Sequence, residues 1–132
     1  MSSLVKSVKQ NGKRILVLED EFPLLRIITQ RLHLAGYTVD GARDSDEAAR
    51  AMLKNKPDLI WLDVYLPNEN GLDFLERIRQ DKRYKKIPAV VIANSSAEDK
   101  VERATKLGAF AYLVKAQHTL GEIVERINTI LK

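Results

Sequence analysis

The chain has 132 residues, with 22 Lys and Arg against 18 Asp and Glu, no cysteine and a hydrophobic content of 45%. This length suits one domain with a real core, and the absence of cysteine excludes a disulfide framework and a cysteine-based metal site. No apolar stretch reaches the roughly 20 residues of a membrane span, and the N-terminus lacks a signal-peptide core. We therefore expect a cytoplasmic protein that does not enter a membrane.

The net charge of +4 comes from the N-terminal segment. Residues 1–14 contain four basic residues and no acidic one, so the other 118 residues carry 18 charges of each sign. Because no basic face remains for the fold itself, we expect no nucleic-acid binding by this domain. Residues 1–12 have no periodic pattern, and we expect them to form a mobile leader before a single domain over 13–132.

Strand and helix patterns alternate five times after the leader. Short apolar runs predict buried strands, and apolar residues at helical spacing predict the helices between them. The residues Ser96-Ala97-Glu98-Asp99 are typical of a capping box, and Ser45 is expected to open an earlier helix. The expected strands are 14–19, 37–41, 58–63, 88–93 and 110–114. The expected helices are 22–35, 45–55, 72–82, 96–107 and 119–131.

Strict alternation predicts an α/β fold of the doubly wound kind, a three-layer sandwich with a five-stranded parallel sheet. Chain order alone does not fix the strand order. The flavodoxin-like order 2-1-3-4-5 places the first and third strands side by side at the switch point, where ligands bind. We expect this order because it lets the charged strand ends meet.

Three of the apolar runs end in charge. RILVL runs into Glu19-Asp20, DLIWL into Asp63, and AFAYLV into Lys115. The carboxyl ends of parallel strands share one edge of the sheet, so three carboxylates and one ammonium are expected in one pocket. Two carboxylates repel each other by roughly 4 kcal/mol at ~4 Å and an effective dielectric near 20. A hard cation relieves this repulsion, which predicts a Mg²⁺ site suited to phosphate chemistry.

Four segments, in this order, carry a resemblance to a known family. They are RILVLEDE, LDVYLPNENG, IPAVVIA and GAFAYLVK. The chain resembles the receiver domain of bacterial two-component response regulators over roughly 14–131, in the manner of a chemotaxis-type single-domain receiver. The resemblance implies a phosphoryl switch rather than an enzyme acting on other substrates, since a receiver catalyses only its own phosphorylation and dephosphorylation.

The resemblance also implies roles for particular residues. Asp63 is expected to accept a phosphoryl group from a phosphohistidine of a sensor histidine kinase or phosphotransfer protein. Glu19 and Asp20, with Asp63 and the backbone carbonyl of Tyr65, are expected to hold Mg²⁺. Lys115 is expected to pair with the phosphoryl oxygens. An anionic phosphoryl group repels a carboxylate nucleophile until a cation offsets the negative charge.

Two positions depart from the family pattern. Ala93 stands where receivers usually carry Ser or Thr, which leaves backbone and side-chain donors such as those of Asn94 to contact the phosphoryl group. Ala116 stands after the lysine, where proline is common, which predicts a differently shaped loop. Tyr112 occupies the position of the family's switching aromatic residue, and simple packing is an equal alternative for it.

The resemblance places an effector surface on the helix 96–107, the strand 110–114 and the helix 119–131. Candidate contact residues are Lys100, Arg103, Lys106 and Tyr112, although the same charges are also typical of a solvated helix face. Three alternatives to a phosphorylated receiver stay open. They are an interaction module that does not rely on phosphorylation, a flavin-binding domain, which lacks a phosphate loop here, and a phosphohydrolase, which would need an acid where Tyr65 stands.

Overall fold

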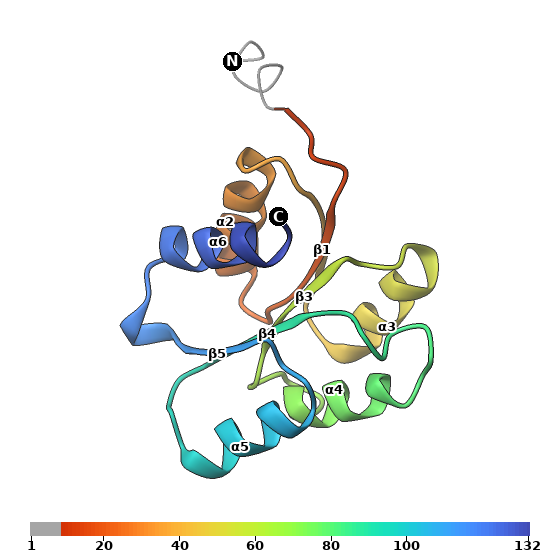
Figure 1. The fold of residues 1–132 in the computed structure, drawn as a ribbon, viewed down its shortest axis with the longest axis vertical. Helices are drawn as coiled ribbons and strands as arrows, with labels where there is room; N and C mark the ends of the chain where they lie inside the picture. The colour runs from red at the N-terminus through yellow and green to blue at the C-terminus, as the bar shows by residue number, and fades with distance from the viewer. Residues whose placement is uncertain (1–8) are drawn as a thin grey trace.

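The computed structural model describes residues 9–132, which form a five-stranded sheet between two layers of helices (Figure 1). The strands are β1 (Arg14–Leu18), β2 (Thr38–Ala42), β3 (Leu59–Asp63), β4 (Ala89–Ala93) and β5 (Ala111–Val114). The helices of this part are α2 (Phe22–Leu34), α3 (Ser45–Lys54), α4 (Gly71–Arg79), α5 (Glu98–Lys106) and α6 (Leu120–Ile130), with a 3-10 turn η1 at Lys115–Gln117. The leader expected over 1–12 falls mostly on residues 1–8, which lie outside the described residues.

The strand order is β2-β1-β3-β4-β5, and every neighbouring pair is parallel. This confirms the flavodoxin-like order predicted from the sequence. The register sets Val17 beside Trp61 and Trp61 beside Val90. All residues of β3 and β4 are buried, which agrees with the apolar sequence of β4 and of β3 up to Asp63. Among residues 9–132 no helix has the length and apolar character needed to cross a bilayer.

Two apolar cores form because successive side chains of a strand point to opposite faces of the sheet. Helices α2 and α6 cover one face, and α3, α4 and α5 cover the other (Figure 1). The strand residues of the α2–α6 core include Ile15, Val17, Leu59, Trp61, Val90, Ile92, Ala111 and Leu113. Those of the opposite core include Leu16, Leu18, Ile60, Leu62, Val91 and Ala93.

Two helix caps differ from the predicted ones, and the starts of α4 and α6 lie one residue from those expected. The cap of α3 is Asp44, whose side chain accepts a hydrogen bond from the Glu47 N–H, so Ser45 is the first helical residue. Helix α5 begins at Glu98 after Ala97, which makes no side-chain capping bond, so the capping box predicted at Ser96 is wrong. The boundaries of all five strands of the described residues lie within one residue of those expected.

Helix α4 ends at Arg79, before the predicted end at 82, because the chain turns there to bury Tyr84. The Arg79 guanidinium holds this turn by donating hydrogen bonds to the carbonyl oxygens of Tyr84 at 2.8 Å and Leu107 at 2.9 Å. Leu107 is the C-terminal cap of α5. Arg79 therefore fixes the end of α5 to the end of α4.

The start of α4 lies against the end of β3. The Gly71 N–H donates to the Val64 carbonyl at 2.7 Å, and the Asn70 side chain caps the helix by accepting from the Leu72 N–H. A Cβ atom at Gly71 would lie 2.2 Å from the backbone carbonyl oxygen of Asp63. Only glycine permits this approach of helix and strand.

Gly71→Ala is expected to lower the free energy of unfolding by roughly 2 kcal/mol or more, because the added methyl group overlaps backbone atoms that cannot move aside. Gly121→Ala is the matched control, since Gly121 also lies in the first turn of a helix. A Cβ there would meet the flexible guanidinium end of Arg31 at 3.2 Å and, in ordinary van der Waals contact, the Thr119 hydroxyl at 3.8 Å. This control should gain about 0.5–1 kcal/mol of helix propensity. Denaturant unfolding measures both values, and equal stabilities of the two variants would contradict the packing described.

Candidate functional site

The site arises where three rows of apolar side chains on the α2–α6 face each end in a charged residue. Side chains on one face of a strand recur every second residue. Glu19 continues the row of β1, Asp63 ends the row of β3, and Lys115 continues the row of β5. The apolar members of these rows are Ile15, Val17, Leu59, Trp61, Ala111 and Leu113. Three charges predicted from separate segments therefore meet above one apolar core.

The Lys115 ammonium is the centre of this cluster. Its Nζ donates to Asp63 Oδ2 at 2.9 Å and lies 3.6 Å from Glu19 Oε1. The other Asp63 oxygen, Oδ1, accepts from the Tyr65 N–H at 2.9 Å. Asp63 is 3% exposed and Glu19 1% exposed, whereas Asp20 is half-buried at the rim. Both oxygens of Asp63 are thus held, which fixes the plane of its carboxylate.

Glu19, Asp20 and Asp63 each offer one carboxylate oxygen, and these oxygens lie within 4.8 Å of one another. Carboxylate oxygen is the ligand that Mg²⁺ prefers in proteins. Three carboxylates face one ammonium, so the cluster has an excess of negative charge in a largely buried place. Both the donor atoms and the charge fit a divalent cation.

The pKa values of the cluster reflect this crowding. Burial raises the pKa of Glu19 from 4.5 to about 7; the Glu21 N–H bond opposes the rise, and the charge of Asp63 adds to it. Burial lowers the pKa of Lys115, but its hydrogen bond to Asp63 and the two carboxylate charges outweigh burial and leave it above its usual value. The ammonium is therefore charged at neutral pH, and burial disfavours the ionised form of Glu19.

The expected switch residues surround the loop after β4. Ala93 is fully buried in the core beneath α4 and α5, and Asn94 is exposed. The Tyr112 hydroxyl donates to the Ser95 carbonyl at 2.7 Å, so β5 is tied to this loop. The loop after Lys115 forms the turn η1.

The cations of the expected effector surface already have partners within the chain. Lys100 contacts the ring and the hydroxyl of Tyr65. Arg103 on α5 binds Asp73 and Glu76 on α4, at 2.6 and 2.9 Å. Lys106 lies 3.4 Å from Glu102 and is the most exposed of the three. A charge reversal at Arg103 would therefore also break the link between α4 and α5.

Two residues that help to shape the site were missed from the sequence, namely Asn70 and Gly71. An Asn before a glycine and an apolar helical pattern is a helix-start signal that would have located the cap. The closeness of Gly71 to Asp63 carries no local signal, because it depends on how α4 packs against β3.

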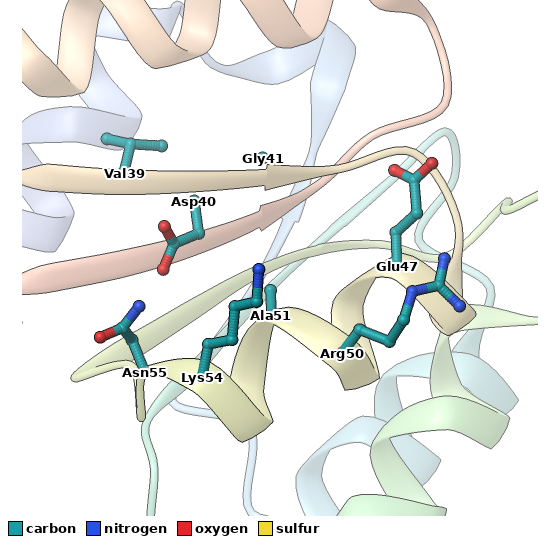
Figure 2. A pocket seen from close by; sticks show the side chains of 8 residues that line it. All are labelled: Val39, Asp40, Gly41, Glu47, Arg50, Ala51, Lys54 and Asn55. Atoms are coloured by element: carbon teal, nitrogen blue, oxygen red, sulfur yellow. The ribbon is translucent and has the colours of Figure 1, made fainter.

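A hollow of about 450 Å³ lies beside the edge strand β2, between this strand and α3 (Figure 2). Its charged lining residues are Asp40, Glu47, Arg50 and Lys54, and Asp40 is already bound to Arg14 at 2.8 Å. None of its lining residues belongs to the acid cluster. Charged side chains around an edge strand are typical of protection against pairing with another strand, and we assign no ligand to this hollow.

Comparisons with known proteins agree with this geometry. The family model of the response regulator receiver domain matches residues 15–128. The phosphate regulon transcriptional regulatory protein PhoB of Pseudomonas aeruginosa is 31% identical over 92% of this chain and 52% of its own length. The chain thus spans about half the length of the curated relatives it matches.

Solved structures give the same result. The non-phosphorylated HemR receiver domain from Leptospira biflexa has a TM-score of 0.83 and 29% identity, covering 92% of this chain and 95% of that one. The Mn²⁺-bound form of response regulator Rcp1 has a TM-score of 0.76 and 31% identity, covering 89% and 93%. With the family model spanning nearly the whole chain, this protein belongs to the response regulator receiver domain family.

Proposed function

We propose that this chain is a phosphorylatable receiver in which Asp63 accepts a phosphoryl group from a phosphohistidine. Phosphorylation by a kinase is the general role of the family to which the chain belongs. The observation that carries the proposal is the buried Asp63 carboxylate, oriented by the Tyr65 N–H and the Lys115 ammonium within a cluster of three carboxylates. The donor would be a sensor histidine kinase or a phosphotransfer protein.

In the proposed reaction an oxygen of Asp63 forms a bond to phosphorus. The bond between phosphorus and the imidazole nitrogen of the donor breaks, and the imidazole leaves with the electron pair. The Lys115 ammonium contacts Asp63, so it can also pair with an oxygen of the incoming phosphoryl group. Its positive charge offsets the repulsion between the Asp63 carboxylate and the phosphoryl anion. The rest of the catalysis is positioning of the carboxylate and the donor.

Glu19, Asp20 and Asp63, with the carbonyl of Tyr65, are the residues proposed to hold Mg²⁺. Receiver domains bind Mg²⁺ at an acidic pocket, and the similar protein Rcp1 was solved with Mn²⁺. When bound, the ion would neutralise the carboxylates and polarise the phosphoryl group. This chain contributes three carboxylate oxygens that are already close together. Because Glu19 and Asp63 are buried, their negative charges are stabilised by a bound cation.

A second candidate function is an interaction module that does not rely on phosphorylation. The observation that favours it is Ala93, a fully buried methyl group at the end of β4 where the family's hydroxyl would stand. In either case we propose that an effector protein docks on the face of α5, β5 and α6. The bond from Tyr112 to the Ser95 carbonyl supports this, because it links that face to the loop beside the site.

Incubation with acetyl phosphate and Mg²⁺ should add one phosphoryl group to the native chain, measured by intact-protein mass spectrometry. Asp63→Asn should add none, because the amide is no nucleophile. Asp99→Asn, the same substitution at an exposed residue of α5, is the control and should be phosphorylated normally. Lys115→Met should slow the reaction by on the order of 10²-fold, as loss of one charge-stabilising donor does. Equal labelling of the Asp63→Asn and native chains would refute Asp63 as the acceptor.

Glu19→Gln should remove a pH dependence of stability. The pKa of Glu19 is about 7 in the folded protein and 4.5 as its ordinary value, so between these values the folded state binds more protons. The stabilising contribution of Glu19 to the free energy of unfolding is fully present below pH 4.5, and it is lost as the pH rises through 7. The loss is at most about 1.4 kcal/mol per pH unit. Denaturant unfolding of the two metal-free proteins across this range measures the difference.

Glu125→Gln, on the exposed side of α6, controls for the removal of one carboxyl group. Added Mg²⁺ should reduce the loss in the native protein, because a bound cation favours the ionised form of Glu19. Native and Glu19→Gln proteins with the same pH profile would contradict the assignment of this buried carboxyl.

Ala93→Thr should enlarge the structural response to beryllofluoride, a mimic of the phosphoryl group. A hydroxyl bonded to a charged acceptor contributes roughly 1.5–3 kcal/mol, and it would act only in the mimic-bound state. Amide chemical shifts of residues 93–96 and Tyr112 report the response. Ala93→Val is the matched control, because it has the shape of Thr without the hydroxyl. If Thr and Val give the same response, the hydroxyl is not what this site lacks.

A further inference from the structure

The amino-terminal edge of the sheet, opposite the acid cluster, carries a concentration of positive charge. An open hollow of about 520 Å³ lies there, between the start of β3 and the loop 80–88 that joins α4 to β4. Among the described residues that line it, Asp58 is the one acid. The basic lining residues are Lys56, Lys82, Arg83, Lys85 and Lys86. Residues 15–132 carry equal numbers of acidic and basic side chains, but the fold gathers five cations around one acid here.

The acids beside this hollow are already bound. Asp58 Oδ2 accepts from the Arg14 N–H at 2.8 Å. Both oxygens of Asp81 accept from the Arg83 guanidinium, at 3.1 and 2.7 Å. No lysine of the hollow forms an ion pair with a carboxylate of residues 9–132. The four lysine ammonium groups therefore remain available to an anion.

A role in stabilising helix ends explains only part of this cluster. Cations interact favourably with the C-terminal end of a helix, but the effect falls off within the last turn. Lys85 and Lys86 lie six and seven residues beyond the end of α4 at Arg79. Four exposed cations within residues 82–86 repel one another. An anion bound among them would offset this repulsion.

The shape of the hollow favours a compact ligand. Pro57 and Ile87 are buried and form its floor, whereas the lysines around them are exposed. Its volume lies in the range of roughly 300–1,000 Å³ that is typical of small-molecule sites. The described lining residues include no aromatic side chain, so the bases of a single-stranded nucleic acid would find no stacking platform.

The excess of cations favours phosphate groups over carboxylates. A chain of phosphates concentrates several negative charges in a small volume, whereas an acidic peptide carries one charge per side chain. The lysine ammonium is a flexible point charge that binds phosphate oxygens through charge-assisted hydrogen bonds. A ligand with a single phosphate group would leave most of these ammonium groups without a partner.

We propose that this hollow binds a compact polyphosphate, either an inorganic oligophosphate or the phosphate chain of a nucleotide, held by Lys56, Lys85 and Lys86. The site is separate from Asp63, because the five residues of β3 span about 17 Å between the two edges of the sheet. Its basic lining needs no Mg²⁺ to attract the ligand. The inference is therefore independent of the proposed phosphorylation of Asp63.

Binding is tested by titrating the ¹⁵N-labelled full chain with sodium tripolyphosphate, without Mg²⁺ and at constant ionic strength. Saturable shifts are expected at the amides of Lys56, Asp58 and residues 82–87. Orthophosphate should bind at least about tenfold more weakly, because it offers one phosphate group. The proposal would be overturned by the absence of saturable shifts, by shifts centred on Asp63 and Lys115, or by equal affinities of the two anions.

ATP, again without Mg²⁺, separates the two sources of a phosphate chain. Tighter binding of ATP than of tripolyphosphate would support a nucleotide whose nucleoside contacts the apolar floor. Equal or weaker binding of ATP would support an inorganic oligophosphate. Hexaglutamate and oligothymidylate represent an acidic peptide and a single-stranded nucleic acid. If either binds more tightly than tripolyphosphate, the assignment of a compact polyphosphate is wrong.

Lys56→Gln and Lys86→Gln remove one charge from each side of the hollow. Each should weaken tripolyphosphate binding about tenfold, because one charge-assisted bond is lost. Both side chains are exposed, so the substitutions leave the core intact. Arg26→Gln is the matched control, since it removes one positive charge from an exposed position on α2 and should leave the affinity unchanged. Unchanged affinity in both lysine variants, or equal weakening in all three variants, would overturn the location.

Discussion

The ammonium of Lys115, held between the buried carboxylates of Asp63 and Glu19, is the interaction on which the carboxyl edge of the sheet depends. Two carboxylates that are almost fully removed from water would otherwise repel each other without compensation. Asp63 ends β3, and Glu19 and Lys115 directly follow β1 and β5, so the three residues meet only when the strand order and the register are both correct. The three charges therefore come together in this strand order and register.

Much of this could be predicted from the sequence, because the relevant signals are local. Apolar runs that end in charge located Glu19, Asp63 and Lys115, and alternation of strands and helices predicted the layers. Helix caps were less certain, since a shift of one residue decides whether Asp44 or Ser45 has the extended backbone of a cap. The pairing of Arg103 with Asp73 and Glu76 could not be predicted, because it depends on how two helices lie side by side.

The hollow of about 200 Å³ that borders Lys115 and Trp61 on the α2–α6 face could not be predicted for the same reason. Its lining residues come from α2, β3, β4, η1 and α6, among others, and no segment of the sequence has a pattern that marks a hollow. The rows that end in charge do explain its position, since the apolar part of each row lies directly below the charged part. Polar chemistry and apolar space are therefore adjacent on this face, and Lys115 borders both.

The unequal attachment of α5 has a mechanical consequence. Its C-terminal end is held by Arg79 and its middle by Arg103, whereas its first turn follows Ala97 without a side-chain cap and is attached through the exposed contact of Lys100 with Tyr65. A helix attached in this way can rotate about its C-terminal end, which lies far from the carboxyl edge of the sheet. Its nine residues span about 14 Å, so a rotation of about 10° would carry the first turn through roughly 2 Å while the pinned end stays in place. A movement of the loop after β4 would therefore shift the exposed side of the first turn of α5 and leave the core beneath the helix almost unchanged.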